Sequence, residues 1–245
     1  ARILYNKGLY RQSLDILDRS KEKCKDLGFS ALLMEIIEFE KLIESQYITR
    51  SISSRAEILS EEAITTSYEI LRIQKYSNLS LQLYGLYLKV GYVRNAKDHL
   101  LVKEFFNSRM LKDEEKDLGF YERVYLYQSY VWYYYMLLDF KMYYRYSQKW
   151  VSLFDEYPEM YSSEKPMYLK GRHNQLNALF LLNRHDKFME AMHNFLQSLK
   201  KNPARNENEK SIEFIYYYTH KINQHYLEGT FQSGLPLVQD IMVAI

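Results

Sequence analysis

Two apolar stripes at helical spacing, separated by a short polar break, occupy residues 175–203 and constrain the fold more than any other segment. The pattern predicts two amphipathic helices joined by a tight turn at residues 183–187. Pro203 ends the segment, because proline cannot continue a helix. Ala191 provides a small side chain where the two helices approach each other. The stripes consist of Leu176, Leu179, Phe180 and Leu182, and then Phe188, Ala191, Met192, Phe195 and Leu199.

The spacing around this turn recurs along the chain. A turn residue is followed five positions later by a small residue, and then by further positions of a helical stripe. Copies begin at Gly8, Ser51, Gly91, Asp186 and Gly229, with a weaker copy at Asp139, and they lie 40 to 48 residues apart. Such self-similarity predicts stacked hairpins, because one hairpin alone leaves an apolar face that its neighbour must cover.

The composition agrees with long helices and few turns. The chain has 245 residues and is 47% hydrophobic, but it contains only 8 glycines and 4 prolines, which disfavours a β-rich fold. The sequence contains no run of 18 or more apolar residues of the kind that indicates a membrane-spanning helix. We expect residues 1–245 to form one all-α domain. Because the chain begins inside a helical pattern, we also expect it to be a fragment of a longer protein.

The expected helices form six hairpins, of which the first is truncated. Gly28 is a typical helix stop, Asn78 is expected to cap a helix, and the acidic residues 113–115 suit a helix start. The expected ranges are 1–7, 10–27, 29–49, 53–74, 79–90, 93–109, 114–137, 140–155, 167–182, 187–201, 209–227 and a last helix from about residue 231.

Motifs that would indicate catalysis or metal binding are missing from the sequence. It contains no glycine-rich phosphate loop and no metalloprotease or serine-hydrolase motif. The six histidines have no metal-ligand spacing, and Cys24 has no histidine nearby in sequence. Glu61 and Glu62 point in different directions on a helix, so we assign them to solubility or to a helix start. We expect no enzymatic activity, no cofactor and no metal ion.

Aromatic residues are unusually frequent: the chain has 25 tyrosines, and residues 125–146 are especially rich in them. One interpretation is packing, with each ring buried and its hydroxyl at the edge. The other is a binding surface, since tyrosine is a favoured interface anchor. Both interpretations stay open. A nucleic-acid platform would also need a basic groove. The net charge is only +2 and the flanking cations are few, so we do not expect a nucleic-acid partner.

The recurring offsets resemble those of tetratricopeptide (TPR) repeats, most specifically in residues 186–203 and 229–241, although the intervals exceed the roughly 34 residues of a standard unit. The resemblance implies an α-solenoid of antiparallel helical hairpins, a TPR-like superhelix. In that family the first helix of each hairpin lines a concave groove that holds a partner segment. By position, the implied partner-binding residues are Asn78, Leu81, Lys89, Ser129, Tyr133, Met136, Arg172, His173, Leu176, Phe180, Tyr216, Thr219 and Asn223.

The function expected from this resemblance is a non-catalytic scaffold that binds a protein or peptide segment in the groove. The alternative is the peptide-sensing portion of a bacterial signalling or transcriptional regulator. A third hypothesis is an enzyme or nucleic-acid binder on a helical scaffold. The single cysteine favours a reducing compartment, so we expect a cytoplasmic location and leave a periplasmic one open.

Overall fold

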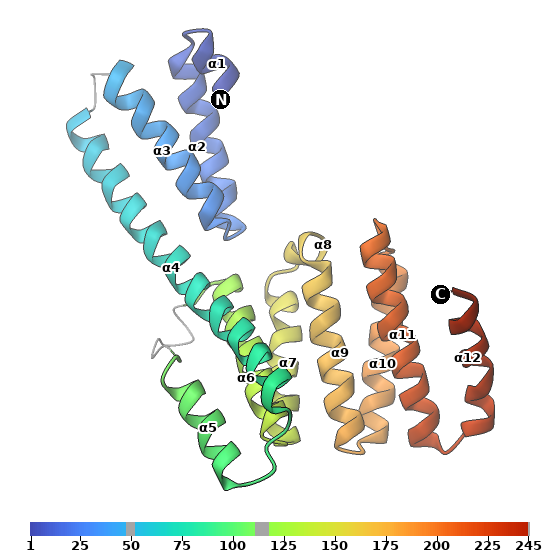
Figure 1. The fold of residues 1–245 in the computed structure, drawn as a ribbon. Helices are drawn as coiled ribbons and strands as arrows, with labels where there is room; N and C mark the ends of the chain where they lie inside the picture. Colours follow the sequence, from blue (N-terminus) through green and yellow to red (C-terminus); the bar gives the residue numbers. More distant parts are fainter. Residues whose placement is uncertain (48–51, 111–117, 245) are drawn as a thin grey trace. The chain divides into compact units, whose positions relative to one another are not determined.

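The computed structural model describes residues 1–47, 52–110 and 118–244, and these residues form helices and short connections without a β-strand (Figure 1). The prediction of an all-α fold is confirmed for them. The helices are α1 (Arg2–Asn6), α2 (Tyr10–Asp26), α3 (Ser30–Tyr47), α4 (Ile52–Val90), α5 (Ala96–Asn107), α6 (Phe120–Met136), α7 (Phe140–Glu156), α8 (Met160–Ser163), α9 (Lys165–Leu181), α10 (His185–Lys201), α11 (Glu207–Glu228) and α12 (Phe231–Ala244).

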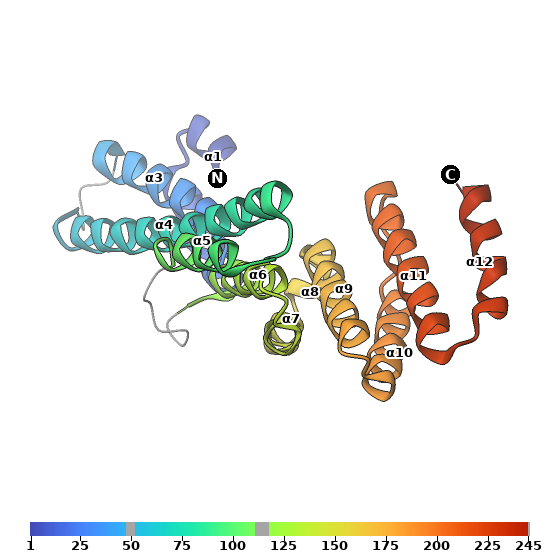
Figure 2. The ribbon, with the colours of Figure 1, turned by 60° about the horizontal axis from the view of Figure 1, so that its bottom comes forward.

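Helices pack against their first or second neighbours in chain order, and the most extensive contacts join α7 to α9. α1 packs on α2, and α2 packs on α3. α9, α10, α11 and α12 follow one another side by side in both Figure 1 and Figure 2, and contacts join α9 to α10, α10 to α11 and α11 to α12. The superhelix implied by the TPR resemblance stays a prediction.

The sequence prediction was wrong at Asn78, where it placed a cap between two helices. The structure has one continuous helix, α4, and the exposed Asn78 lies inside it. Tyr76, Leu79 and Leu83 are buried at helical spacing, so the apolar stripe continues through this point. No glycine or proline lies between residues 52 and 84 to interrupt the helix. Continuous burial therefore outweighs the capping preference of one asparagine.

The other described boundaries lie within about three residues of the expected ones. Two differences remain. The short helix α8 occupies part of the loop expected at residues 156–166, and α6 begins at Phe120. The helix start expected at residues 113–115 and the turn expected at Ser51 lie outside the described residues.

Residues with a left-handed backbone follow several of the helices. Gly91 after α4 and Gly229 after α11 have φ angles of 70° and 67°, a region that glycine enters at little cost. Leu138 after α6 and Asn183 after α9 have φ angles of 59° and 52°. Each of these residues lies within three positions of a turn that the sequence predicts.

The chain divides into two compact units, which are described separately. Unit 1 comprises residues 1–78 and 116–122, and unit 2 comprises residues 79–115 and 123–245. Helices α4 and α6 each contribute residues to both units. That residues 1–245 form a single domain stays a prediction.

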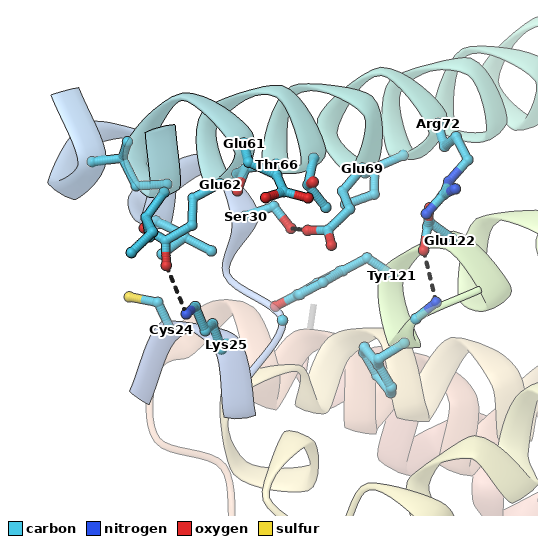
Figure 3. Close-up of a pocket in the computed structure, with 18 residues that line it drawn as sticks. Cys24, Lys25, Ser30, Glu61, Glu62, Thr66, Glu69, Arg72, Tyr121 and Glu122 are labelled. Carbon is cyan, nitrogen blue, oxygen red and sulfur yellow. Dashed lines mark hydrogen bonds and ion pairs between the residues drawn. The ribbon is translucent and has the colours of Figure 1, made fainter. Parts of the chain in front are cut away.

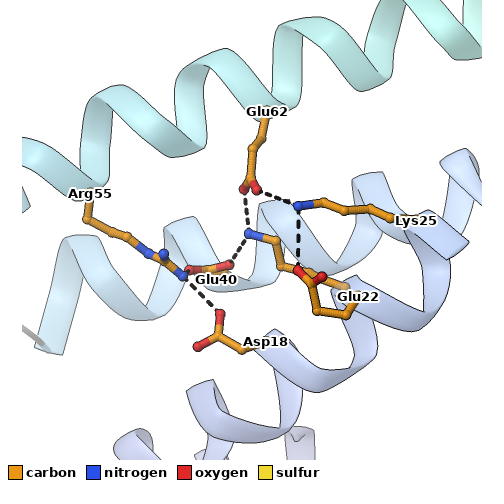
Figure 4. A network of polar contacts seen from close by, with 7 residues as sticks. Asp18, Glu22, Lys25, Glu40, Arg55 and Glu62 are labelled. Carbon is orange, nitrogen blue, oxygen red and sulfur yellow. Dashed lines mark hydrogen bonds and ion pairs between the residues drawn. The ribbon is translucent and has the colours of Figure 1, made fainter.

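A buried ion network joins three helices of unit 1 (Figure 4). Lys21 of α2 is almost fully buried, and its Nζ lies 2.9 Å from Oε2 of Glu40 on α3. The same ammonium group pairs with Glu62 of α4. Arg55 of α4 pairs with Glu40 and, at 2.9 Å, with Asp18 of α2. Because unpaired buried charge is costly, this network fixes α2, α3 and α4 against one another.

An apolar core accompanies the network in unit 1. Leu17 and Cys24 of α2 face α3, and Leu59 and Ala63 contribute from α4. The remaining members of this cluster are Leu33, Ile36, Ile37 and Ile43 on α3.

Unit 2 buries much of its tyrosine-rich segment. Tyr133 stacks on Phe106 with ring centroids 4.0 Å apart, and Tyr130 stacks on Tyr146 at 4.1 Å. Tyr143 is buried, and its hydroxyl donates a 2.8 Å hydrogen bond to Oδ1 of Asn174. These contacts agree with the packing interpretation of the tyrosines. A role of other tyrosines in partner binding stays a prediction.

No helix in the described part of the chain has both the length and the apolar content that a membrane span requires. Within the same residues, no three histidine, cysteine, aspartate or glutamate side chains come together in a group able to hold a metal ion.

The close contact of α7 with α9 predicts a steric requirement at Gly171. A Cβ atom there would lie 3.3 Å from three ring atoms of Trp150, which is completely buried. We expect Gly171→Val to lower the free energy of unfolding by about 1–3 kcal/mol through overpacking. Urea unfolding followed by circular dichroism measures this change.

The matched control is Gly85→Val in α4, where a Cβ atom would meet no atom within 4 Å. We expect it to change stability by less than about 0.5 kcal/mol. Equal losses for the two variants would contradict the packing assigned to Gly171.

Candidate binding pocket

Unit 1 contains a pocket of about 520 Å³ lined by α2, α3, α4 and residues 119–122 (Figure 3). Its apolar lining combines deeply buried side chains with one more exposed isoleucine, Ile58. Its polar lining includes carboxylates, hydroxyls and two cationic groups. An apolar cavity with a few polar groups is typical of a ligand site. The other apolar members are Leu33, Ile37, Ile73 and Phe120.

The turn between α2 and α3 shapes one side of this pocket. Gly28 has a φ of 65° and ends α2, which lets Ser30 begin α3 at the pocket. The ring of Phe29 contacts Tyr121 with centroids 6.3 Å apart. Tyr121 thereby lines the pocket from α6 although it lies more than 90 residues away in sequence.

Four carboxylates and two cationic groups line the pocket, and two of the carboxylates are engaged in ion pairs within the unit. Glu62 pairs with Lys21 of the buried network and, at 3.1 Å, with Lys25. Burial alone would raise the pKa of Glu62, but the hydrogen bonds from the two lysines outweigh it and hold that pKa below its usual range. Glu62 is therefore ionised, and the positive charges of Lys21 and Lys25 balance its negative charge.

Glu122 is engaged in a similar way. Its Oε1 lies 2.5 Å from Nε of Arg72, and its Oε2 accepts a 2.7 Å hydrogen bond from the backbone N–H of Gly119. Glu122 is buried, so these partners offset the cost of removing its charge from water.

The other two carboxylates, Glu61 and Glu69, have no cationic partner among the described residues. Glu69 accepts a 3.0 Å hydrogen bond from the hydroxyl of Ser30, and that is its one contact of this kind in the described part of the chain. Glu61 is exposed and makes neither a hydrogen bond nor an ion pair there. The polar side of the pocket therefore has an excess of negative charge.

Cys24, the single cysteine of the chain, also lines the pocket and is buried. Burial raises the pKa of its thiol. A nucleophilic cysteine needs the opposite shift, because the thiolate is the reactive form. Cys24 is therefore suited to packing and not to covalent catalysis.

None of the residues that the TPR resemblance assigns to partner binding lines this pocket. Asn78, Leu81 and Lys89 are exposed on α4. Ser129 and Tyr133 are buried in α6, where Ser129 donates a hydrogen bond to the carbonyl oxygen of Tyr125 and Tyr133 packs on Phe106. Met136 of α6 and Leu176 of α9 are also buried. These four buried side chains contribute to packing and present little surface to a partner.

The remaining assigned residues come together on α9 and α11, which pack against each other in unit 2. His173 stacks on Tyr216 with centroids 4.3 Å apart. Phe180 contacts Tyr226 edge-on at 5.6 Å. Arg172 is tied to its own helix, donating to the hydroxyl of Tyr168 and to Oε1 of Gln175, and the Thr219 hydroxyl donates to the carbonyl oxygen of Ile215. Asn223 is half-buried.

Sequence reasoning missed the pocket because its lining comes from distant segments. It also assigned Glu61 and Glu62 to solubility or a helix start, whereas both line the pocket and Glu62 belongs to the buried network. One signal was present: α4 carries several acidic residues and threonines within residues 61–69, on a helix expected to be packed.

Comparison of the chain with protein-family models, with curated proteins and with solved structures gives no match.

A pair of histidines in unit 2 predicts a loss of stability in acid. Nδ1 of His173 lies 3.0 Å from Nε2 of His220, which is fully buried. Burial, with a smaller effect of the Lys170 charge, lowers the pKa of His173 to about 4, and burial lowers that of His220 as well. The unfolded chain therefore binds protons below about pH 6.5 that the folded chain excludes until about pH 4.

We expect the free energy of unfolding to fall between about pH 6.5 and pH 4 and this contribution to level off below that range. On going from pH 7 to pH 4.5, the free energy of unfolding of His173→Gln should fall by about 2 kcal/mol less than that of the wild type. Urea unfolding at both pH values measures the difference. His99→Gln, at an exposed position, is the control and should behave like the wild type. Identical pH dependence for His173→Gln and the wild type would contradict the assignment.

Proposed function

We propose that the protein is a non-catalytic binding module that holds a segment of a partner protein or peptide. The observation that carries this proposal is the pocket of about 520 Å³ in unit 1, which combines an apolar lining with carboxylates that lack a cationic partner among the described residues. Ligand pockets typically have volumes of about 300–1,000 Å³, so this pocket is large enough for a side chain of a partner segment. The partner segment would enter it with one anchoring residue.

The packing of neighbouring helices supports the wider form of the proposal, an α-solenoid of TPR-like hairpins with a concave groove. α9 contacts both α10 and α11, and α11 contacts both α10 and α12, as stacked hairpins require. Arg172, His173, Phe180, Tyr216 and Asn223 on α9 and α11 are all partly accessible. In this proposal they provide a second contact surface, in unit 2.

The state of the pocket groups favours binding over catalysis. The thiol of Cys24 has a raised pKa, and Glu62 and Glu122 are ion-paired within the unit. General acid–base catalysis requires a group poised to exchange protons near the working pH, whereas the hydrogen bonds from Lys21 and Lys25 hold the pKa of Glu62 below its usual range.

The second candidate function is a peptide-sensing portion of a regulator, and the course of α4 favours it. This helix lines the pocket with residues 58–73 and places Leu79 and Leu83 in a core cluster of unit 2. Binding in unit 1 could therefore alter a helix that unit 2 also uses. If so, a bound peptide should slow amide hydrogen exchange in residues 79–90, as measured by mass spectrometry. Unchanged exchange there would contradict the sensing role.

Blocking the mouth of the pocket tests the proposed function. Thr65 is exposed on α4 and lines the pocket, so a tryptophan there occupies space that a ligand needs. We expect peptides selected from a random library on the wild-type protein to bind Thr65→Trp at least about tenfold more weakly, because they lose buried contact area. Fluorescence anisotropy with labelled peptides measures the affinities.

The control is Gln74→Trp, an exposed position on the same helix that does not line the pocket. It should bind the selected peptides as the wild type does. If the library yields no binder, or if every binder tolerates Thr65→Trp, the pocket is not the site of partner binding.

A further inference from the structure

We infer that the pocket of unit 1 recognises an arginine side chain of the partner segment, and that Glu69 is the carboxylate that pairs with the guanidinium group. This inference rests on the proposed function and specifies the residue that anchors the partner. It is carried by the charges of the pocket, by a buried hydroxyl and by the aromatic and apolar lining.

The charges leave Glu69 as the acceptor for a ligand. Glu62 is neutralised by Lys21 and Lys25, and Glu122 by Arg72. Glu69 has one neutral donor, the Ser30 hydroxyl at 3.0 Å, and is half-buried, so a cation beside it would be less screened than at an open surface. The nearby exposed Glu61 adds negative charge at the same pocket. A cationic ligand therefore meets a charge that the protein itself leaves unpaired within the described residues.

The hydroxyl of Thr66 is a second, independent indication of a ligand. Thr66 is only 3% exposed and lines the pocket beside Glu69 (Figure 3). Its hydroxyl makes no hydrogen bond with any residue that the structure describes, and its oxygen is not among the fully buried polar atoms, so it is accessible to a ligand in the pocket. An N–H group of a bound ligand would satisfy it as an acceptor.

The rest of the lining favours arginine over lysine. The ring of Tyr121 reaches across the pocket below the Glu69 carboxylate in Figure 3. A planar guanidinium group stacks on an aromatic ring and can donate to a carboxylate and a hydroxyl at the same time, whereas an ammonium group is a compact, strongly hydrated charge. The apolar side chains of Leu33 and Ile73 suit the aliphatic stem of an arginine.

Short blocked peptides test this inference on the whole chain. The probe is acetyl-Gly-Arg-Gly-amide, and the comparison peptides carry lysine or the uncharged arginine isostere citrulline. Isothermal titration calorimetry of each peptide into the whole chain measures binding. We expect the arginine peptide to bind in a saturable manner. The lysine and citrulline peptides should bind at least about tenfold more weakly.

Two matched variants identify the carboxylate. Glu69→Gln keeps an acceptor for Ser30 but removes the charge, and it should weaken binding of the arginine peptide about tenfold or more. Glu57→Gln removes the same charge from an exposed position of α4 outside the pocket and should leave binding of the arginine peptide unchanged. Melting temperatures near that of the wild type would show that both variants are folded.

Three results would overturn the inference: no binding of the arginine peptide, equal affinity for the lysine or citrulline peptide, or undiminished affinity of Glu69→Gln for the arginine peptide. The proposed function would fail separately, through the peptide library. If the library yields peptides without arginine that lose binding on Thr65→Trp, the pocket binds a partner segment but the arginine assignment is wrong.

Discussion

The buried ammonium group of Lys21 is the interaction on which unit 1 depends. It lies between Glu40 of α3 and Glu62 of α4, and Arg55 extends the network to Asp18. A charge placed away from water requires well-positioned partners, so these pairs permit few alternative arrangements of α2, α3 and α4. Apolar packing buries more surface than the ion pairs, but it constrains the orientation of the helices less. The network therefore sets the positions of the helices that line the pocket.

The same network divides the acidic residues of α4 into two groups. Glu62 forms ion pairs with Lys21 and Lys25 within the unit. Glu69, two turns further along the helix, contacts only the hydroxyl of Ser30 among the polar groups of the described residues. One helix thus provides both a structural carboxylate and a carboxylate suited to a ligand. In the proposed function, affinity comes from the apolar lining and selectivity comes from the unpaired charge.

The sequence predicts the helices better than the pocket. Local patterns identify α7 and α10 to within two residues, because an amphipathic helix and its turns are encoded by neighbours in the chain. The break predicted at Asn78 fails because burial of Tyr76 and Leu79 extends the stripe. The pocket depends on Tyr121 meeting the α2–α3 turn, a contact between distant segments that no single periodicity encodes.

A double-mutant cycle on Lys21 and Glu40 tests the role of the network most directly. The free energy of unfolding would be measured for Lys21→Met, Glu40→Met and the double variant. If the network fixes the helices, each single variant loses at least about 2 kcal/mol, and the double variant loses at least about 1 kcal/mol less than the sum of the two. Losses that add to within about 0.5 kcal/mol would show that the two residues act independently and would contradict the account.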